Sequence, residues 1–65
     1  MKVLDRNGTE LALEDTVLQR RGVHSGKQRM LITGFDIRSN EVYLIGVCLE
    51  TRKKVKWLSH GTEKQ

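Results

Sequence analysis

Hydrophobic and polar residues alternate along most of the chain in short runs, a pattern typical of β-strands that bury one face. The runs expected to form strands are residues 2–4, 9–13, 16–20, 29–36, 41–50 and 54–58. Turn-forming residues separate them, and Asn7-Gly8 is the strongest hairpin signal because both residues tolerate positive φ. A helix over residues 9–20 is the alternative, but β-branched residues and missing caps favour strands. The pattern therefore predicts an all-β fold of five or six short strands.

The two longest runs carry further structural detail. Both faces of residues 41–50 are apolar, which predicts a central strand. Gly34 interrupts residues 29–36 and indicates a bulge or a sharp bend, as a glycine inside a strand often does. Alternation in this run assigns side chains to two faces, one with Met30 and Ile32 and one with Leu31, Thr33 and Phe35.

The last run contains the only tryptophan of the chain. Alternation assigns its side chains to two faces, one with Val55 and Trp57 and one with Lys54, Lys56 and Leu58. A tryptophan in so small a domain is more often part of the core than a platform for stacking on bases, so Trp57 is expected inside. Residues 59–65 are predicted to be a flexible C-terminal tail, which leaves a single domain over residues 1–58.

The length of the chain limits both its architecture and its chemistry. Sixty-five residues form one domain at most and bury a small core, which leaves little material for a deep catalytic cleft. An open sheet of this size would expose reactive edges, so closure into a small barrel or sandwich is favoured. We therefore expect a binding domain without a cofactor rather than an enzyme.

Two sets of residues resemble known small barrels. Asp5, Gly8, Leu11, Asp15 and Val17 match the opening D-x-x-G-x-x-L-x-x-G-D-x-V of the PhnA-type C-terminal domain, with Glu14 where glycine is usual. Gly26, Met30, Ile32, Thr33 and Gly34 resemble the G-x-x-M-x-V-T-G strand of the YodC-like proteins, with one extra residue between Gly26 and Met30. Together the two patterns cover most of residues 3–58. The resemblance implies a five- to six-stranded SH3-like barrel and carries over no catalytic residue. KOW and Tudor-type modules share this barrel, and many of them bind RNA, DNA or proteins, so the resemblance implies a binding module.

Charge indicates the class of partner. The chain has 12 Lys and Arg against 8 Asp and Glu, a net charge of +4 that fits a polyanion. The basic residues that stand in or beside expected loops form two groups, Arg20, Arg21, Lys27 and Arg29, and Arg52, Lys53, Lys54 and Lys56. Convergent cations are enough to contact backbone phosphates. The alternative is that these residues keep strand edges soluble and unpaired.

Residues that often carry chemistry give weaker signals in this chain. Cys48 is the only cysteine, which excludes an internal disulfide, favours a cytoplasmic location and predicts a buried, inert thiol. His24 and His60 show no metal-ligand spacing with it, so no metal site is expected. Tyr43 is expected to pack along its strand, with stacking on a base as the alternative. The sequence shows no signal peptide and no apolar membrane span, so no membrane partner is expected.

These observations together predict a function. We expect a small non-enzymatic binding module of a bacterium or phage that contacts DNA or RNA through the two basic groups. Phosphate contacts would dominate over base readout. The alternative is a protein-interaction or assembly module, since a chain this short gains buried surface by forming a homo-oligomer. An enzyme ranks third, because no active-site motif is present.

Overall fold

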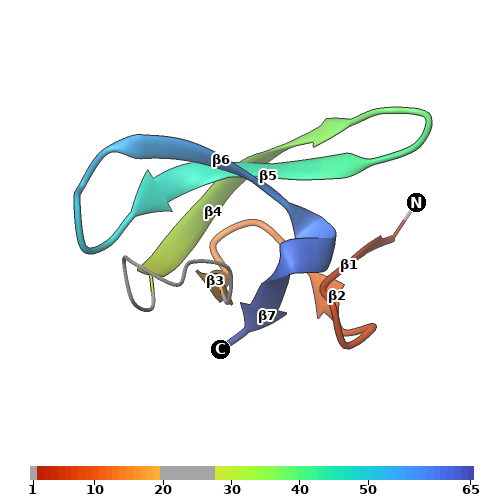
Figure 1. Cartoon of the computed structure of the whole chain (residues 1–65), viewed down its shortest axis with the longest axis horizontal. Helices are drawn as coiled ribbons and strands as arrows, with labels where there is room; N and C mark the ends of the chain where they lie inside the picture. The colour runs from red at the N-terminus through yellow and green to blue at the C-terminus, as the bar shows by residue number, and fades with distance from the viewer. Residues whose placement is uncertain (1, 20–27) are drawn as a thin grey trace.

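The computed structural model describes residues 2–19 and 28–65, and this part of the chain is all-β (Figure 1). Its elements in chain order are β1 (Val3–Leu4), β2 (Glu10–Leu11), β3 (Thr16–Gln19), β4 (Gln28–Ile37), β5 (Val42–Cys48), β6 (Lys54–Leu58), the 3₁₀-helix η1 (Ser59–Gly61) and β7 (Thr62–Lys64). No helix in the described part has the length and apolar character that crossing a membrane requires. The all-β prediction is confirmed, and each run predicted to be a strand contains one.

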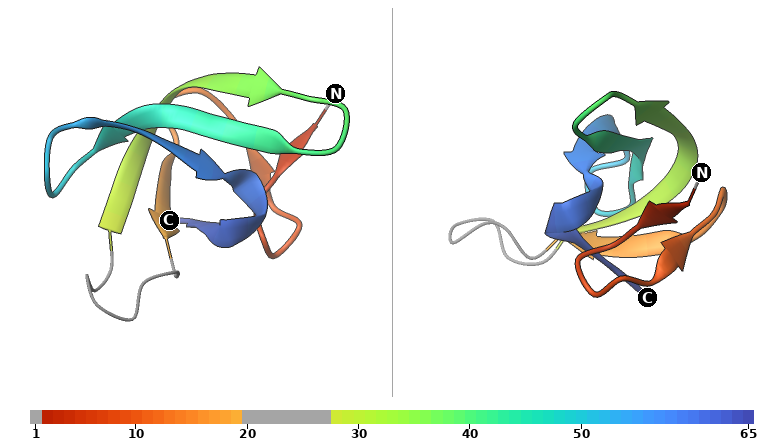
Figure 2. Two further views of the ribbon diagram at one scale, coloured as in Figure 1. Left: turned by 45° about the horizontal axis from the view of Figure 1, so that its top comes forward. Right: turned by 90° about the vertical axis from the view of Figure 1, so that its right-hand side faces the viewer.

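Five strands form one antiparallel sheet in the order β6-β5-β4-β3-β7, while β1 and β2 form a separate hairpin. β5 is paired on both sides, as its two apolar faces predicted. The edge strands β6 and β7 are joined only by the three residues of η1. The edges of a flat five-stranded sheet would lie about 19 Å apart, whereas a three-residue 3₁₀-helix spans about 6 Å. The sheet therefore has to curl, and Figure 2 shows that it does.

Gly34 marks a β-bulge in β4, as predicted. The pairing of β4 with β5 shifts by one position between Ile32 and Gly34, so Thr33 is an extra residue on the bulged strand. One extra residue inverts the alternation of side chains that follows it. Phe35 therefore packs against the core, and the prediction that it shares a face with exposed Leu31 is wrong.

The core forms where the β1–β2 hairpin meets the curled sheet. Its buried members are Val3, Leu11, Val17, Met30, Ile32, Leu44 and Trp57. Trp57 is only 9% exposed, which confirms its predicted place inside the fold. At Gly46, β5 lies so close to β4 that a Cβ atom would collide with the carbonyl oxygen of Leu31. A side chain at this position is therefore incompatible with the pairing of the two strands.

Asp5 fixes the hairpin to the rest of the fold. Its buried carboxylate accepts hydrogen bonds from the backbone N–H groups of Asn7, Thr9 and Lys64, each at 2.8 Å. The first two bonds close the turn between β1 and β2, where Gly8 has a φ of 80°. The third bond joins the hairpin to β7. The predicted Asn7-Gly8 hairpin is therefore confirmed, and the aspartate before it organises the turn.

Glu14 lies in a second tight turn, with a left-handed φ of 72°. Its N–H donates to the carbonyl of Ile32 at 2.8 Å, and the Asp15 carboxylate accepts from the N–H of Ala12 at 2.9 Å. A left-handed φ favours glycine, the usual residue at this position in the D-x-x-G-x-x-L-x-x-G-D-x-V pattern. Because the chain turns here, only two residues of the predicted run 9–13 form a strand.

The prediction of a flexible tail over residues 59–65 is wrong. These residues form η1 and β7, and β7 pairs antiparallel with β3. Ser59 and Thr62 are buried, and the Thr62 hydroxyl donates to the carbonyl of Ser59 at 2.8 Å. β7 covers an edge of β3 that would otherwise expose unpaired backbone groups. The folded unit therefore extends to the end of β7, beyond the boundary predicted from the sequence.

Candidate nucleic-acid interface

Five of the eight predicted contact residues fall within the described part of the chain. They are Arg29, Arg52, Lys53, Lys54 and Lys56. Arg20, Arg21 and Lys27 lie outside the described residues. The described part of the site therefore consists of the second basic group and Arg29.

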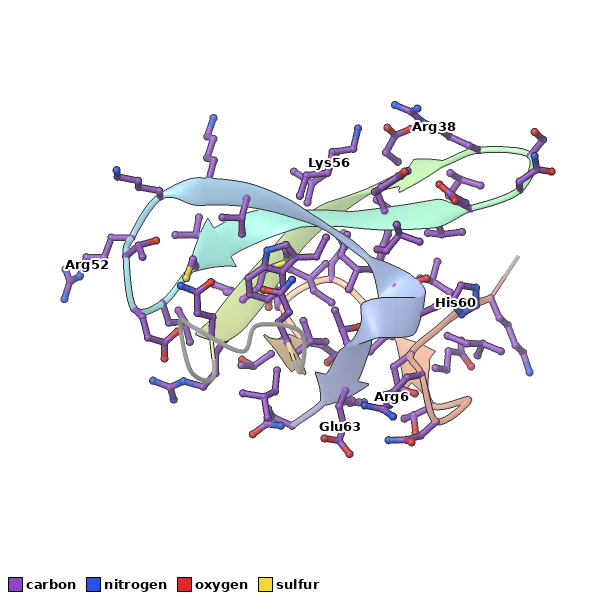
Figure 3. The ribbon with its side chains drawn as sticks, in the orientation of Figure 1. Arg6, Arg38, Arg52, Lys56, His60 and Glu63 are labelled. Atoms are coloured by element: carbon purple, nitrogen blue, oxygen red, sulfur yellow. The ribbon has the colours of Figure 1, made fainter. Side chains whose placement is uncertain are left out.

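The hairpin between β5 and β6 presents three consecutive cations. Its turn is closed by the N–H of Arg52, which donates to the Cys48 carbonyl at 2.7 Å, and by the N–H of Cys48, which donates to the Lys53 carbonyl at 2.9 Å. Arg52 has a left-handed φ of 61°, and its side chain extends away from the hairpin (Figure 3). Arg52, Lys53 and Lys54 are exposed, and none forms an ion pair with another residue of the described part. The hairpin tip therefore carries three positive charges that no described carboxylate neutralises.

Arg29 lies at the same end of the sheet as this hairpin. Its guanidinium Nε is 2.8 Å from Oε2 of Glu50, its backbone N–H donates to Oε1 at 2.7 Å, and its carbonyl accepts from the N–H of Leu49 at 2.8 Å. These bonds of the backbone and side chain of Arg29 hold the pKa of Glu50 below its ordinary value. The structure thus brings one member of the first basic group beside the second, with its charge matched by Glu50.

A second cluster of charges lies on the outer face of the sheet, around Asp36 in β4. Oδ2 of Asp36 is 2.7 Å from Nζ of Lys56 and 3.1 Å from Nη2 of Arg38. These two hydrogen bonds lower the pKa of the Asp36 carboxyl, so it remains ionised at neutral pH. Lys56 is exposed, as predicted, but its positive charge is paired with the carboxylate of Asp36.

Tyr43 lies between these charged side chains. Nζ of Lys56 is 4.9 Å from the centre of its ring, and Cζ of Arg38 is 5.2 Å from the same point. The Tyr43 hydroxyl donates to Oε2 of Glu41 at 2.6 Å, which together with burial raises the pKa of the phenol. Cations close to the ring are attracted by its π electrons and occupy the surface that a base would need for stacking.

Arg38 is a cation of this face that the sequence analysis missed. Arg38 lies in the turn after β4, where the sequence predicts only a connection between two strands. It reaches Tyr43 because Asp36 pairs with Tyr43 across the two strands. That register depends on the bulge before it, so no local sequence signal marks Arg38 as part of the cluster.

Charge is unevenly distributed between the two parts of the fold. Residues 28–58 contain six cations and three carboxylates, an excess of three positive charges. The remaining described residues, 2–19 and 59–65, contain three cations and five carboxylates. Figure 3 shows Arg52, Lys56 and Arg38 along the β4–β5 and β5–β6 hairpins. Arg6 and Glu63 lie on the opposite side of the molecule. The positive part of the described surface is therefore the one formed by β4, β5 and β6.

Two features of the described residues bear on chemistry, the thiol of Cys48 and a hollow beside the turn between β4 and β5. No three His, Cys, Asp or Glu side chains in this part of the chain are placed to hold a metal ion. Cys48 is buried, as predicted; a hydrogen bond from Thr51 lowers its pKa, with burial acting in the opposite direction. A hollow of about 280 Å³ at the turn between β4 and β5 is lined by four exposed residues, Arg38, Ser39, Asn40 and Glu41. A small molecule there would keep much of its surface in water.

Comparisons of the chain with family models, with curated proteins and with solved structures each gave no match.

Proposed function

We propose that this protein is a small non-enzymatic binding module that contacts nucleic acid, DNA or RNA, through the β5–β6 hairpin and the adjoining face of β6. The observation that carries the proposal is the hairpin tip. Arg52, Lys53 and Lys54 are consecutive, exposed and without a carboxylate partner in the described part of the chain. Three such charges on one turn attract a polyanion more strongly than charges scattered over the surface.

The proposed mechanism is the release of counterions from the nucleic acid. Each lysine or arginine that neutralises a phosphate releases condensed cations, so affinity falls as salt rises. Arg52 also supplies a planar fork that can bind two phosphate oxygens at once. The main-chain bonds across the turn hold its Cα position, which reduces the ordering needed on binding. Base sequence would have little influence, because phosphate contacts carry no sequence information.

We also propose that the curled sheet and the β1–β2 hairpin form an SH3-like barrel of the kind implied by the sequence resemblance. The support comes from the role of each matching residue. Asp5 accepts three backbone hydrogen bonds, and Gly8 has a positive φ. Leu11 and Val17 belong to the core. The pattern is therefore occupied by residues that shape this fold, which is how a fold signature differs from a functional motif.

The proposal is tested by binding to a fluorescein-labelled nucleic acid of about 12 base pairs or nucleotides at several salt concentrations. The variant Lys53→Gln/Lys54→Gln removes two charges from the hairpin tip. The control Lys2→Gln/Arg6→Gln removes the same charge from exposed residues outside β4, β5 and β6. On a DNA duplex we expect the first variant to reduce the slope of log K against log salt by about 1.8, at about 0.9 per phosphate contact. Equal effects of the two variants would mean that net charge alone is responsible, and the proposed site would be wrong.

A second candidate function, assembly with a protein partner or another copy, is favoured by the apolar character of the outer face. Leu31 and Leu49 are 36% and 38% exposed, and Ile45 and Val47 between them are only partly buried. Sedimentation velocity over a range of protein concentrations separates this candidate from the first. Assembly through this face would give a mass above that of the monomer, and the mass would persist at high salt.

A further inference from the structure

We infer that the nucleic acid bound by this module is double-stranded rather than single-stranded. The inference rests on the proposed function and names the class of partner for the same site. It follows from two features, the fate of every aromatic ring in the chain and the arrangement of the cations along the β5–β6 hairpin.

Proteins that hold single strands stack unpaired bases on aromatic side chains, and this stacking supplies much of their affinity. The chain has three such residues, one each of Phe, Tyr and Trp, and all three are described. Phe35 packs against the core, and Trp57 is buried within it. Trp57 cannot reach a base unless the core opens, and the partly buried ring of Phe35 is already in contact with that core.

Tyr43 is the remaining ring, and it is already engaged. Lys56 and Arg38 lie within 5.2 Å of its centre, and both also bind Asp36. Its hydroxyl is held by Glu41. A base could stack on Tyr43 only after a cation moved away from both the ring and the carboxylate. The ring of Tyr43 is therefore not available for stacking on a base either.

The cations, by contrast, form a row suited to a regular line of phosphates. Lys54 and Lys56 project from the same side of β6 and are spaced by two residues, about 6.8 Å along the strand. Lys53 and Arg52 precede Lys54 in the turn between β5 and β6, and both are exposed. A duplex presents one charge per 1.7 Å of its axis and holds more condensed counterions than a single strand. A site that works by charge alone therefore gains more from a duplex.

The difference has a measurable size. With the three unpaired cations of the tip engaged, the slope of log K against log salt is about −2.7 for B-form DNA and about −2.1 for a single strand. Without stacking to compensate, we expect the preference for the duplex over the single strand to grow about threefold between about 150 and 20 mM salt.

The experiment uses one labelled 12-nucleotide DNA strand, either alone or annealed to its unlabelled complement, with the full-length protein at about 20 and 150 mM salt. Fluorescence anisotropy gives both affinities, and Trp57 emission reports any contact of the indole. The inference predicts tighter binding of the duplex and unchanged Trp57 emission with either ligand. Equal or tighter binding of the single strand would overturn the inference and leave the proposed function intact. Failure of both ligands to bind would overturn the proposed function together with the inference.

The variant Tyr43→Leu provides a second readout. It removes the ring that lies on the same face of the sheet as the cations while keeping an apolar side chain on the strand. We expect affinity for the duplex to change by less than about twofold, because no base stacks there. A loss of binding to the single strand, with the fold intact by circular dichroism, would show that Tyr43 does take up a base and would contradict the inference.

Discussion

Replacement of Asp5 by asparagine tests how the fold is held together. Asparagine has the same shape, so its amide oxygen can still accept from the N–H groups of Asn7 and Thr9. The amide nitrogen then faces the N–H of Lys64, which loses its acceptor. If the amide flips, the two turn bonds are lost instead. The substitution therefore removes at least one of the three hydrogen bonds, takes the charge from the rest and places two N–H donors against each other in a partly buried position.

The expected cost follows from these bonds. A hydrogen bond to a charged group contributes about 1.5–3 kcal/mol, and a buried donor without an acceptor costs about 1–3 kcal/mol. Because the hydrogen bond of the Lys64 N–H is only partly buried, so that this donor can partly turn to water, we expect Asp5→Asn to lower the free energy of unfolding by about 2–4 kcal/mol. A 65-residue domain has a total stability of about 3–10 kcal/mol. The loss is therefore a large fraction of the total, and the variant should unfold at a clearly lower urea concentration than the wild type.

The same carboxylate should make stability depend on pH. Burial acts to raise the pKa of Asp5, but hydrogen bonds from Lys64, Thr9 and Asn7 and the charge of Arg6 outweigh it and hold the pKa below its ordinary value. A carboxyl with a depressed pKa in the folded state stabilises the fold above its unfolded pKa, about 3.9, and loses that contribution as pH falls through the folded value. The wild type should thus lose stability below about pH 4. The asparagine variant should lose less over the same range.

Urea denaturation followed by Trp57 fluorescence at pH 7 and pH 3 measures both effects. Glu10→Gln is the matched control, because it removes one carboxylate from an exposed position, and it should change stability by less than about 0.5 kcal/mol. If Asp5→Asn unfolds at the same urea concentration as the wild type at pH 7, the three hydrogen bonds do not stabilise the fold.

Three further predictions test other parts of the structure. Glu14→Gly should raise the free energy of unfolding by about 0.5 kcal/mol, because relief of the left-handed backbone exceeds the entropy cost of glycine; a lower urea midpoint would contradict this. Gly46→Ala should cost about 3 kcal/mol or more through collision with the Leu31 carbonyl, whereas Gly34→Ala, where a Cβ meets nothing within 4 Å, should cost little; equal urea midpoints would refute the distinction. Asp36→Asn should free Lys56 and Arg38 from their carboxylate partner and tighten DNA binding about threefold at low salt. Unchanged affinity would exclude those two cations from the site.

The sequence predicted those parts of the fold that depend on local chemistry. Asn7-Gly8 marked the first hairpin because glycine accepts the positive φ that the turn needs. Alternation placed Trp57 in the core because β6 is regular over its five residues. The consecutive cations of the last hairpin could also be placed, since a turn between two strands has few alternatives to exposure.

The remaining features depend on pairing between distant segments, which the sequence alone does not show. β7 is a strand because β3 offers it an edge and Asp5 accepts the N–H of Lys64, although its own residues are polar and few. Phe35 reached the core through a bulge whose effect on the alternation was not foreseen. The contacts of Lys56 with Asp36 and Tyr43 arise from the register of three strands, so its partial neutralisation could not be predicted.

The most direct test of the proposed function is an NMR titration of the ¹⁵N-labelled protein with a short DNA duplex at low and then moderate salt. The proposal predicts amide shifts concentrated at Arg52, Lys53 and Lys54, extending along β6 and weakening as salt rises. Amides of the β1–β2 hairpin should not move. Shifts centred on that hairpin, or no shifts at the β5–β6 tip at low salt, would contradict the proposal.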